Sequence, residues 1–154
     1  MNAEQSTTTR ILVVEDNPLD VELLRLALKE EPAWQVETVV AEDGEKAISL
    51  LTQGAADPLA RRPDLIVLDL NVPRRDGTEV LRTIRGTKVL SSLLVAVLSS
   101  SPGDVIEDRL TAAHVTADGH FTKPSNIDDF LQLGRVLRMW YEQQGQTRCE
   151  GCSQ

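Results

Sequence analysis

The sequence predicts a doubly wound α/β fold in which helices cover both faces of a parallel sheet. Continuous apolar runs recur along the chain, and segments of helical period separate them. Runs that are apolar at every position are typical of strands buried on both faces, as in a parallel sheet. Strand and helix signals alternate strictly through five repeats, so we expect a three-layer (βα)5 arrangement with right-handed crossovers.

The first two repeats occupy the N-terminal part of the chain. The first strand is expected at 10–15, and Asn17-Pro18 then supplies a helix cap and a proline suited to the first helical turn. Apolar residues recur at helical spacing until Pro32 ends this helix. The second strand is expected at 35–40, and its helix opens at Asp43-Gly44 and continues through Leu51.

A polar, proline-containing stretch at 53–63 is too irregular for a helix or a strand, so we expect a surface loop there. Three further repeats follow it. Their expected strands and helices are, in chain order, 64–69, a helix carrying Val80, Leu81 and Ile84, 93–98, 104–113, 120–122, and 127–141 or beyond.

Polar residues follow the expected strands at the points where the strands end. A flavodoxin-like strand order of 2-1-3-4-5 places the first and third strands side by side, and such folds bind ligands beyond the carboxyl ends of their strands. Glu15, Asp16, Asp69, Ser99 and Lys123 would then converge on one crevice. The carboxylates would supply a divalent metal site, while the hydroxyl and the ammonium would face an anion. The sequence therefore predicts a site for phosphoryl transfer onto a carboxylate.

Size and charge narrow the possible functions. The chain has 154 residues, a formal net charge of −8 and a pI near 4.7, so it fits one domain and carries no basic stripe for nucleic acid. We find no signal peptide and no stretch of the roughly 20 apolar residues that cross a bilayer. We therefore expect a soluble, cytoplasmic protein that binds neither nucleic acid nor a membrane.

The expected domain spans 10–144, between a flexible N-terminal segment, 1–9, and a flexible C-terminal tail, 145–154. Cys149 and Cys152 lie in this tail. A Cys-x-x-Cys pair can be half of a zinc site or a redox motif, but a tetrahedral zinc site needs four ligands and the chain has no second pair. Incidental thiols in a mobile tail are the favoured interpretation, and a disulfide or a metal shared between chains are the alternatives.

The order of these motifs resembles that of response-regulator receiver domains over most of the chain. The resemblance depends on five segments: Val14-Glu15-Asp16-Asn17-Pro18, Asp69-Leu70-Asn71-Val72-Pro73, Asp76-Gly77, Ser99 and Lys123-Pro124. The separation of Asp69 from Ser99, 30 residues, is usual in that family. The sequences around Asp16 and Asp69, the long loop before the third strand and Trp140 resemble one subgroup, the single-domain regulators paired with bacterial phytochrome histidine kinases.

The resemblance implies roles for the acidic residues. Asp69 is the implied phosphoacceptor, and Asp16 and Asp69 are implied ligands of Mg²⁺ or Mn²⁺. Glu15 would act on the cation directly or through water, and the backbone carbonyl of Asn71 would be a further ligand. The protein would then be no conventional enzyme, because it would catalyse only its own phosphorylation and dephosphorylation.

The resemblance also implies how the signal is formed. Lys123 and Ser99 would contact the phosphoryl group, Ser100 could add a backbone N–H, and a cis Lys123-Pro124 bond would aim the ammonium at Asp69. Receivers often carry a switching Tyr or Phe three residues before this lysine. His120 stands there, and its ring can change charge near neutral pH. The 24 residues between Ser99 and Lys123 are also more than is usual in the family.

Other interpretations compete with this one. An Asp or Ser after a strand is commonly a helix cap, and a lysine before proline is commonly a solvated loop residue. A phosphate-independent interaction module with a vestigial site is the main alternative function, although the complete residue set argues against it. A metal-dependent phosphatase would need a second acid where the chain has Asn71.

The last helix suggests an assembly. A plot at 100° per residue places a sheet-covering face on one side, namely Ile127, Phe130, Leu131, Gly134, Leu137 and Tyr141. It leaves a second apolar stripe of Leu133, Val136, Met139 and Trp140. Because contiguous apolar stripes with a tryptophan commonly mark interfaces, we expect a homodimer through this helix and the edge of the fifth strand. Burial of the stripe within the monomer is the alternative.

Overall fold

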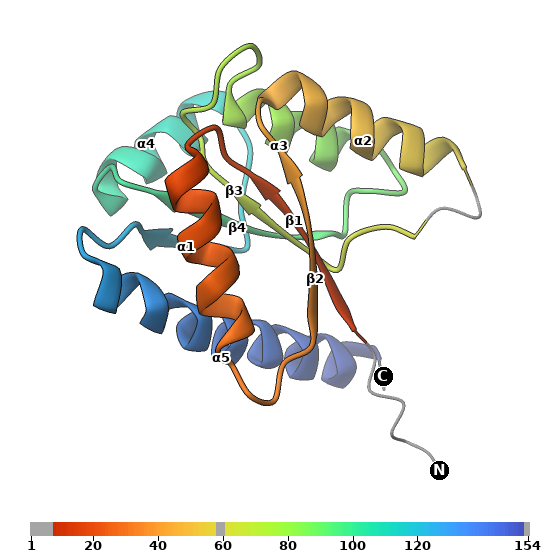
Figure 1. Ribbon diagram of the computed structural model, residues 1–154. Helices are drawn as coiled ribbons and strands as arrows, with labels where there is room; N and C mark the ends of the chain where they lie inside the picture. Colours follow the sequence, from red (N-terminus) through yellow and green to blue (C-terminus); the bar gives the residue numbers. More distant parts are fainter. Residues whose placement is uncertain (1–7, 58–60, 153–154) are drawn as a thin grey trace.

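The strands lie in one parallel sheet, and the predicted strand order is confirmed. The computed structural model describes residues 8–57 and 61–152, with side chains described up to residue 145. Within these residues the strands are β1 (Thr9–Val14), β2 (Val36–Ala41), β3 (Leu65–Leu68), β4 (Leu94–Ser99) and β5 (Gly119–Thr122). They are ordered β2-β1-β3-β4-β5, and each neighbouring pair is parallel (Figure 1).

Helices cover both faces of this sheet. They are α1 (Pro18–Lys29), α2 (Gly44–Ala56), α3 (Gly77–Gly86), α4 (Gly103–Ala113) and α5 (Ile127–Cys152). α1 and α5 pack on the face to which Ile11 and Val13 of β1 point. α2, α3 and α4 pack on the opposite face, against Leu12 and Val14 (Figure 1). The alternation along β1 therefore supplies both layers of the core.

Side-chain caps fix the starts of three helices next to the ends of the strands. Asn17 accepts hydrogen bonds from the backbone N–H groups of the first turn of α1, and Asp43 does the same for α2. Asp76 and Glu79 form a capping box at the start of α3. These caps satisfy helical N–H groups that would otherwise have no partner.

Two expectations about chain segments differ from the structure. α2 extends to Ala56, so the first part of the expected loop at 53–63 is helical. α5 continues to Cys152, through most of the expected flexible tail. Neither extension contains a proline, so no residue that is excluded from a helix interior stops either helix. Residues 1–7 and the side chains of Cys149 and Cys152 lie outside what the structure describes, and the alternatives for the thiols stay open.

The face of α5 that covers the sheet is not the one expected. Leu133 is buried with Phe130 and Leu137, and the indole ring of Trp140 packs edge-on against Phe121, with ring centroids 5.6 Å apart. Ile127, which was expected on the covering face, is exposed. Residues three apart differ by only 60° around a helix, so Leu133 lies on the same side as Phe130. Of the expected second stripe, Val136 and Met139 are the residues left exposed, at 47% and 48%.

α5 meets α1 through a glycine. A Cβ at Gly134 would overlap the backbone carbonyl of Ala27, so the two helix backbones approach more closely than any side chain permits.

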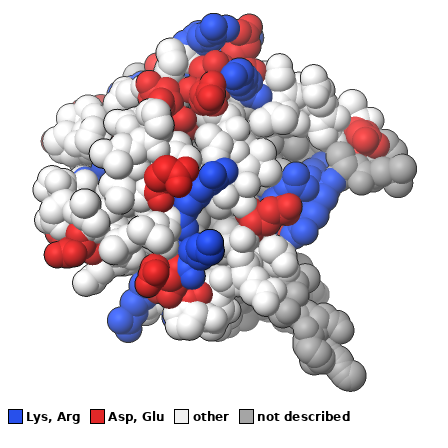
Figure 2. Space-filling model, viewed as in Figure 1, with Lys and Arg blue, Asp and Glu red and all other residues white. Residues whose placement is uncertain are grey.

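The surface gives two general results. No helix in the described ranges is both long and apolar enough to cross a membrane. On the face shown in Figure 2, Lys and Arg side chains are interspersed with Asp and Glu.

Candidate functional site

Three of the expected acids gather at the carboxyl ends of β1 and β3. One carboxylate oxygen from each of Glu15, Asp16 and Asp69 lies within 4.8 Å of the others. Backbone hydrogen bonds set this geometry, because Asp69 N–H donates to the carbonyl of Val14 and Glu15 N–H donates to that of Ala41, each at 3.0 Å. Glu15 and Asp69 are only 5% and 7% exposed, whereas Asp16 is open to solvent.

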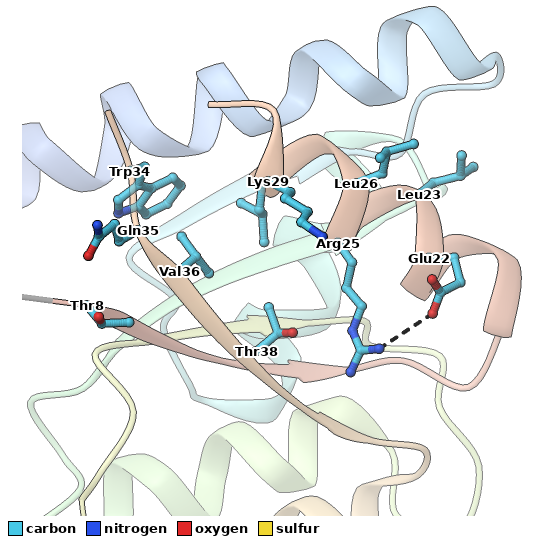
Figure 3. A pocket seen from close by; sticks show the side chains of 11 residues that line it. Thr8, Glu22, Leu23, Arg25, Leu26, Lys29, Trp34, Gln35, Val36 and Thr38 are labelled. Atoms are coloured by element: carbon cyan, nitrogen blue, oxygen red, sulfur yellow. Dashed lines mark ion pairs between the residues drawn. The ribbon is translucent and has the colours of Figure 1, made fainter. Parts of the chain in front are cut away.

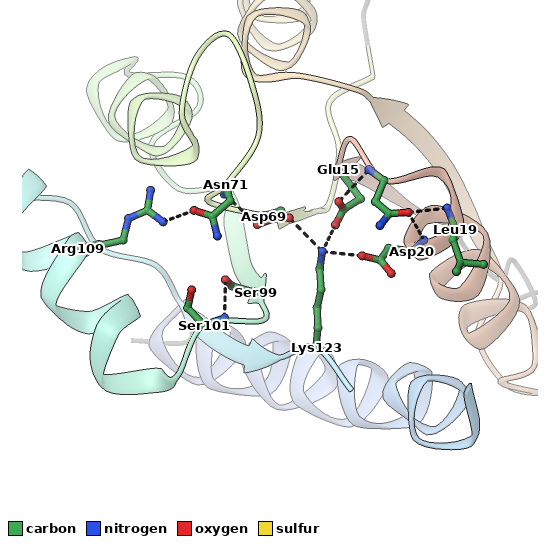
Figure 4. A network of polar contacts seen from close by, with 10 residues as sticks. Glu15, Leu19, Asp20, Asp69, Asn71, Ser99, Ser101, Arg109 and Lys123 are labelled. Atoms are coloured by element: carbon green, nitrogen blue, oxygen red, sulfur yellow. Dashed lines mark hydrogen bonds and ion pairs between the residues drawn. The ribbon is translucent and has the colours of Figure 1, made fainter. Parts of the chain in front are cut away.

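Lys123 enters this cluster from the end of β5. Its Nζ lies 2.6 Å from Glu15 Oε1, 2.8 Å from Asp20 Oδ2 and 3.1 Å from Asp69 Oδ2 (Figure 4). The Lys123 backbone N–H donates to the carbonyl of Ser99 at 2.9 Å, which aligns the ends of β4 and β5. No cis peptide bond occurs among the described residues, so the expected cis Lys123-Pro124 bond is wrong; the ammonium reaches Asp69 without it.

Burial and neighbouring charges shift the pKa values of Glu15 and Lys123. Burial raises the pKa of Glu15 above its ordinary value, although the hydrogen bond from Lys123 works in the opposite direction. Burial alone would lower the pKa of Lys123, but hydrogen bonds to Asp20 and Glu15 and the charge of Asp69 outweigh it and raise that pKa. Lys123 is therefore a permanent cation in this site, and its side chain is only 11% exposed.

The remaining expected residues line the other side of Asp69. Ser99 is fully buried, and its Oγ accepts a hydrogen bond from the Ser101 N–H at 3.2 Å. Asn71 N–H donates to Asp69 Oδ1 at 2.9 Å, which bends the chain just after β3. The His120 ring contacts α4, where its Nε2 lies 3.3 Å from Glu107 Oε2.

Two residues of the site were not anticipated. Asp20, in the first turn of α1, contacts Lys123. Arg109, in α4, donates to Asn71 Oδ1 at 2.7 Å, to the Leu70 carbonyl at 3.3 Å and to Asp76 Oδ2 at 3.0 Å (Figure 4). Both lie on helices rather than at strand ends. The available signal for Asp20 was an acidic side chain in the first turn of the helix that directly follows Glu15 and Asp16.

The acids fit a divalent cation of the magnesium class. Carboxylate oxygens are the ligands that hard cations prefer, and Mg²⁺ is usually held by one or two carboxylates with water and phosphate oxygens. Glu15, Asp16 and Asp69 are the cluster of this kind among the described residues. Two of these carboxylates are buried, and one ammonium cannot neutralise three acids. A cation here would offset the remaining charge.

The structure has one surface hollow beside the carboxylate cluster and a larger groove away from it. One of about 560 Å³ is lined by Glu15 and Asp16 together with Glu42 and Asp43. A wider, open groove of about 800 Å³ lies elsewhere, between α1 and β2, with Leu23, Leu26 and Trp34 in its lining (Figure 3). Glu15, Asp16 and Asp69 are not among the residues that line this wider groove, so its size does not identify the candidate site.

Comparisons with known proteins agree with this geometry. The family model for the response regulator receiver domain matches residues 11–134. Response regulator Rcp1 of Synechocystis sp. is 32% identical over 143 residues, which cover 92% of this chain and 95% of Rcp1. The chain also matches the transcriptional regulatory protein TrcR and the probable transcriptional regulatory protein TcrX of Mycobacterium tuberculosis, of which it spans about half.

Two solved structures are similar in fold and sequence. The phosphorylated cyanobacterial phytochrome response regulator RcpA superposes with a TM-score of 0.76 and 32% identity, covering 88% of this chain and 94% of RcpA. The Mn²⁺-bound form of response regulator Rcp1 gives a TM-score of 0.73 and 31% identity, covering 86% of this chain and 94% of the other.

Proposed function

Because this chain belongs to the family of response regulator receiver domains, we propose that it accepts a phosphoryl group on Asp69 from a sensor histidine kinase. The observation that carries the proposal is the placement of the Glu15 and Asp16 carboxylates and the Lys123 ammonium around Asp69. A vestigial site would not need to keep a permanently charged lysine in contact with buried acids. The proposed reaction depends on a divalent cation, Mg²⁺ or Mn²⁺, held by Glu15, Asp16, Asp69 and the backbone carbonyl of Asn71.

The reaction is an in-line displacement at phosphorus. A carboxylate oxygen of Asp69 attacks, the P–O bond forms, the P–N bond to the kinase histidine breaks, and the imidazole takes up a proton from water. The cation neutralises the charge on the phosphoryl oxygens. Lys123 offers a point charge to one of these oxygens, and the Ser99 hydroxyl and the Ser100 N–H offer hydrogen bonds. Positioning and charge neutralisation therefore supply most of the catalysis.

We propose that the kinase is a bacterial phytochrome. The support is the similarity over nearly the whole chain to RcpA, a cyanobacterial phytochrome response regulator. In this proposal a receiver unit at 10–144 acts in the cytoplasm and signals by contact with another protein. Its catalysis is confined to its own phosphorylation and dephosphorylation.

Ser99 and His120 are the proposed switch residues. Ser99 would turn its hydroxyl toward the phosphoryl group, and the His120 ring would change its contact with Glu107 on α4. A phosphorylation-dependent response of His120→Tyr equal to that of the wild type would contradict this role.

A homodimer through α5 and the β5 edge remains part of the proposal, with a smaller surface than expected. Val136 and Met139 are its exposed apolar residues, while Leu133 and most of Trp140 serve the monomer core. Sedimentation of the wild type and a Val136→Ser, Met139→Ser variant, each with and without phosphorylation, tests this. A wild type that sediments as a monomer in both states contradicts it.

The test of the proposed function is labelling with acetyl phosphate. Wild type incubated with acetyl phosphate and Mg²⁺ should gain about 80 Da, the mass of one phosphoryl group. Asp69→Asn should not, because an amide is a poor nucleophile. EDTA should abolish the gain in the wild type. Strong labelling of Asp69→Asn, or no labelling of the wild type with Mg²⁺, would refute the proposal.

A further inference from the structure

Asp20 is the acid of the site that stands apart from the carboxylate cluster. Its Oδ2 lies 2.8 Å from Lys123 Nζ, closer than Asp69, and it reaches the ammonium from α1 rather than from a strand end. Figure 4 shows Asp69 on one side of the ammonium and Asp20 on the other. The carboxylate cluster of Glu15, Asp16 and Asp69 does not include Asp20.

The other two partners of Lys123, Glu15 and Asp69, also belong to the carboxylate cluster that would bind a cation. Glu15 and Asp69 each contribute an oxygen to the carboxylate cluster and an oxygen to the ammonium. A doubly charged cation bound among the three clustered acids would attract both carboxylates more strongly than a single ammonium does. Asp20 lies outside that cluster, so a bound cation would not draw its carboxylate away from Lys123.

The ammonium can serve all three acids at once because it has three N–H donors. With its side chain 11% exposed, it has little access to water as a replacement partner. When the cation attracts Glu15 and Asp69, the contact with Asp20 is the one that still holds the ammonium in place. When a phosphoryl group arrives, the same partner competes with it for the ammonium.

We propose that Asp20 is a positioning residue that holds Lys123 in the site while cation and phosphoryl donor bind, and that it restrains the transfer of Lys123 to the phosphoryl group. This inference rests on the proposed function. Asn in place of Asp20 keeps an oxygen that accepts from the ammonium but removes the competing charge. Phosphorylation of Asp20→Asn should therefore be faster than that of the wild type.

The experiment is the rate of phosphorylation of the full chain by acetyl phosphate at saturating Mg²⁺. We expect a rate increase of about fivefold for Asp20→Asn, since one nearby charge acts on a highly charged transition state. The matched control is Glu22→Gln, which removes the same charge from an exposed position of α1 paired with Arg25. A rate for Asp20→Asn equal to that of the wild type or of Glu22→Gln overturns the inference.

A double-mutant cycle tests whether Asp20 acts through Lys123. In a Lys123→Ala background, Asp20→Asn should leave the rate unchanged; a full fivefold gain there would mean a direct effect on the donor and would overturn the inference. A crystal structure of the wild type with Mg²⁺ is independent of whether the variants fold. It should retain the Lys123–Asp20 contact, and its loss would also overturn the inference. A wild type that takes no label refutes the proposed function itself, and this inference with it.

Discussion

The side chain of Arg109 holds the side chain of Asn71, two residues after Asp69, through a hydrogen bond of 2.7 Å. The same guanidinium also contacts the Leu70 carbonyl and Asp76 Oδ2. One residue of α4 thus fixes the loop between β3 and α3, which carries Asp69, the proposed phosphoacceptor, and Asn71, an expected metal ligand. The state of the site and the position of α4 are therefore linked by a defined set of contacts.

Arg109→Ala should loosen this loop. We expect a loss of about 1 kcal/mol in the free energy of unfolding, since the contacts are partly exposed, and faster amide exchange in residues 70–76 and α4. Arg109→Lys should restore little, because an ammonium cannot reproduce the fork of the guanidinium. Arg82→Ala, which removes a single 3.4 Å contact to α4, is the control. Equal exchange in Arg109→Ala and Arg82→Ala would contradict the prediction.

Asp16→Ala should weaken Mg²⁺ binding more than Glu15→Ala does. Asp16 is open to solvent, and its carboxylate has no hydrogen-bond or ion-pair partner among the described residues. Glu15, in contrast, already contacts Lys123 at 2.6 Å and accepts a hydrogen bond from the Asn17 N–H at 3.1 Å. Titration calorimetry with Mg²⁺ measures the difference. Equal losses in the two variants would argue against a direct contact between Asp16 and the cation.

Lys123→Ala should destabilise the protein without a divalent cation and much less with one. Removing the ammonium leaves the buried carboxylates of Glu15 and Asp69 without a positive partner. The loss of one partner from a buried ion pair lowers the free energy of unfolding by roughly 3 kcal/mol. Mg²⁺ would replace the missing charge. Urea unfolding with EDTA and with Mg²⁺ measures both values, and Lys88→Ala, at an exposed position, is the control. A loss of stability that Mg²⁺ leaves unchanged would contradict the prediction.

The stability of the start of α3 should depend on pH through Asp76. Burial alone would raise the pKa of Asp76, but hydrogen bonds from Thr78 and the charge of Arg109 lower it below its ordinary value of 3.8. A carboxyl with a lowered pKa contributes stability above pH 3.8, and this contribution is lost as the pH falls through the lowered value.

Asp76→Asn should therefore cost most stability near neutral pH, and the cost should shrink below pH 3.8. Urea unfolding across that range measures the difference from the wild type. Asp104→Asn, in the first turn of α4, is the matched control. A cost that does not change with pH would show that the charge of Asp76 contributes nothing.

The sequence allowed the strand order and the gathering of the acids to be predicted for one physical reason. Glu15, Asp69 and Lys123 follow apolar strands directly, and parallel strands end at the same edge of a sheet, so position along the chain determines position in space. Asp20 and Arg109 could not be found in this way. Their roles depend on how far a helix is rotated toward the site, and that rotation is set by packing with distant residues.

The prediction for α5 was wrong for a related reason. The division of its surface into two opposite stripes treated Leu133 and Trp140 as outward residues, although each lies within 60° of a core position. Whether such a flanking residue is buried depends on how wide the contact between α5 and the sheet is. Phe121 and Gly119 of β5 provide room for the Trp140 ring, which the helix sequence alone does not reveal.

The contact of Gly134 with Ala27 has a mechanical consequence. Protein interiors are close-packed, so a shift of one element is transmitted to its neighbours through the atoms in contact. Here backbone meets backbone, and no side chain is available to yield. A tilt of α1, whose first turn carries Asp20, would therefore be transmitted directly to α5 at Gly134.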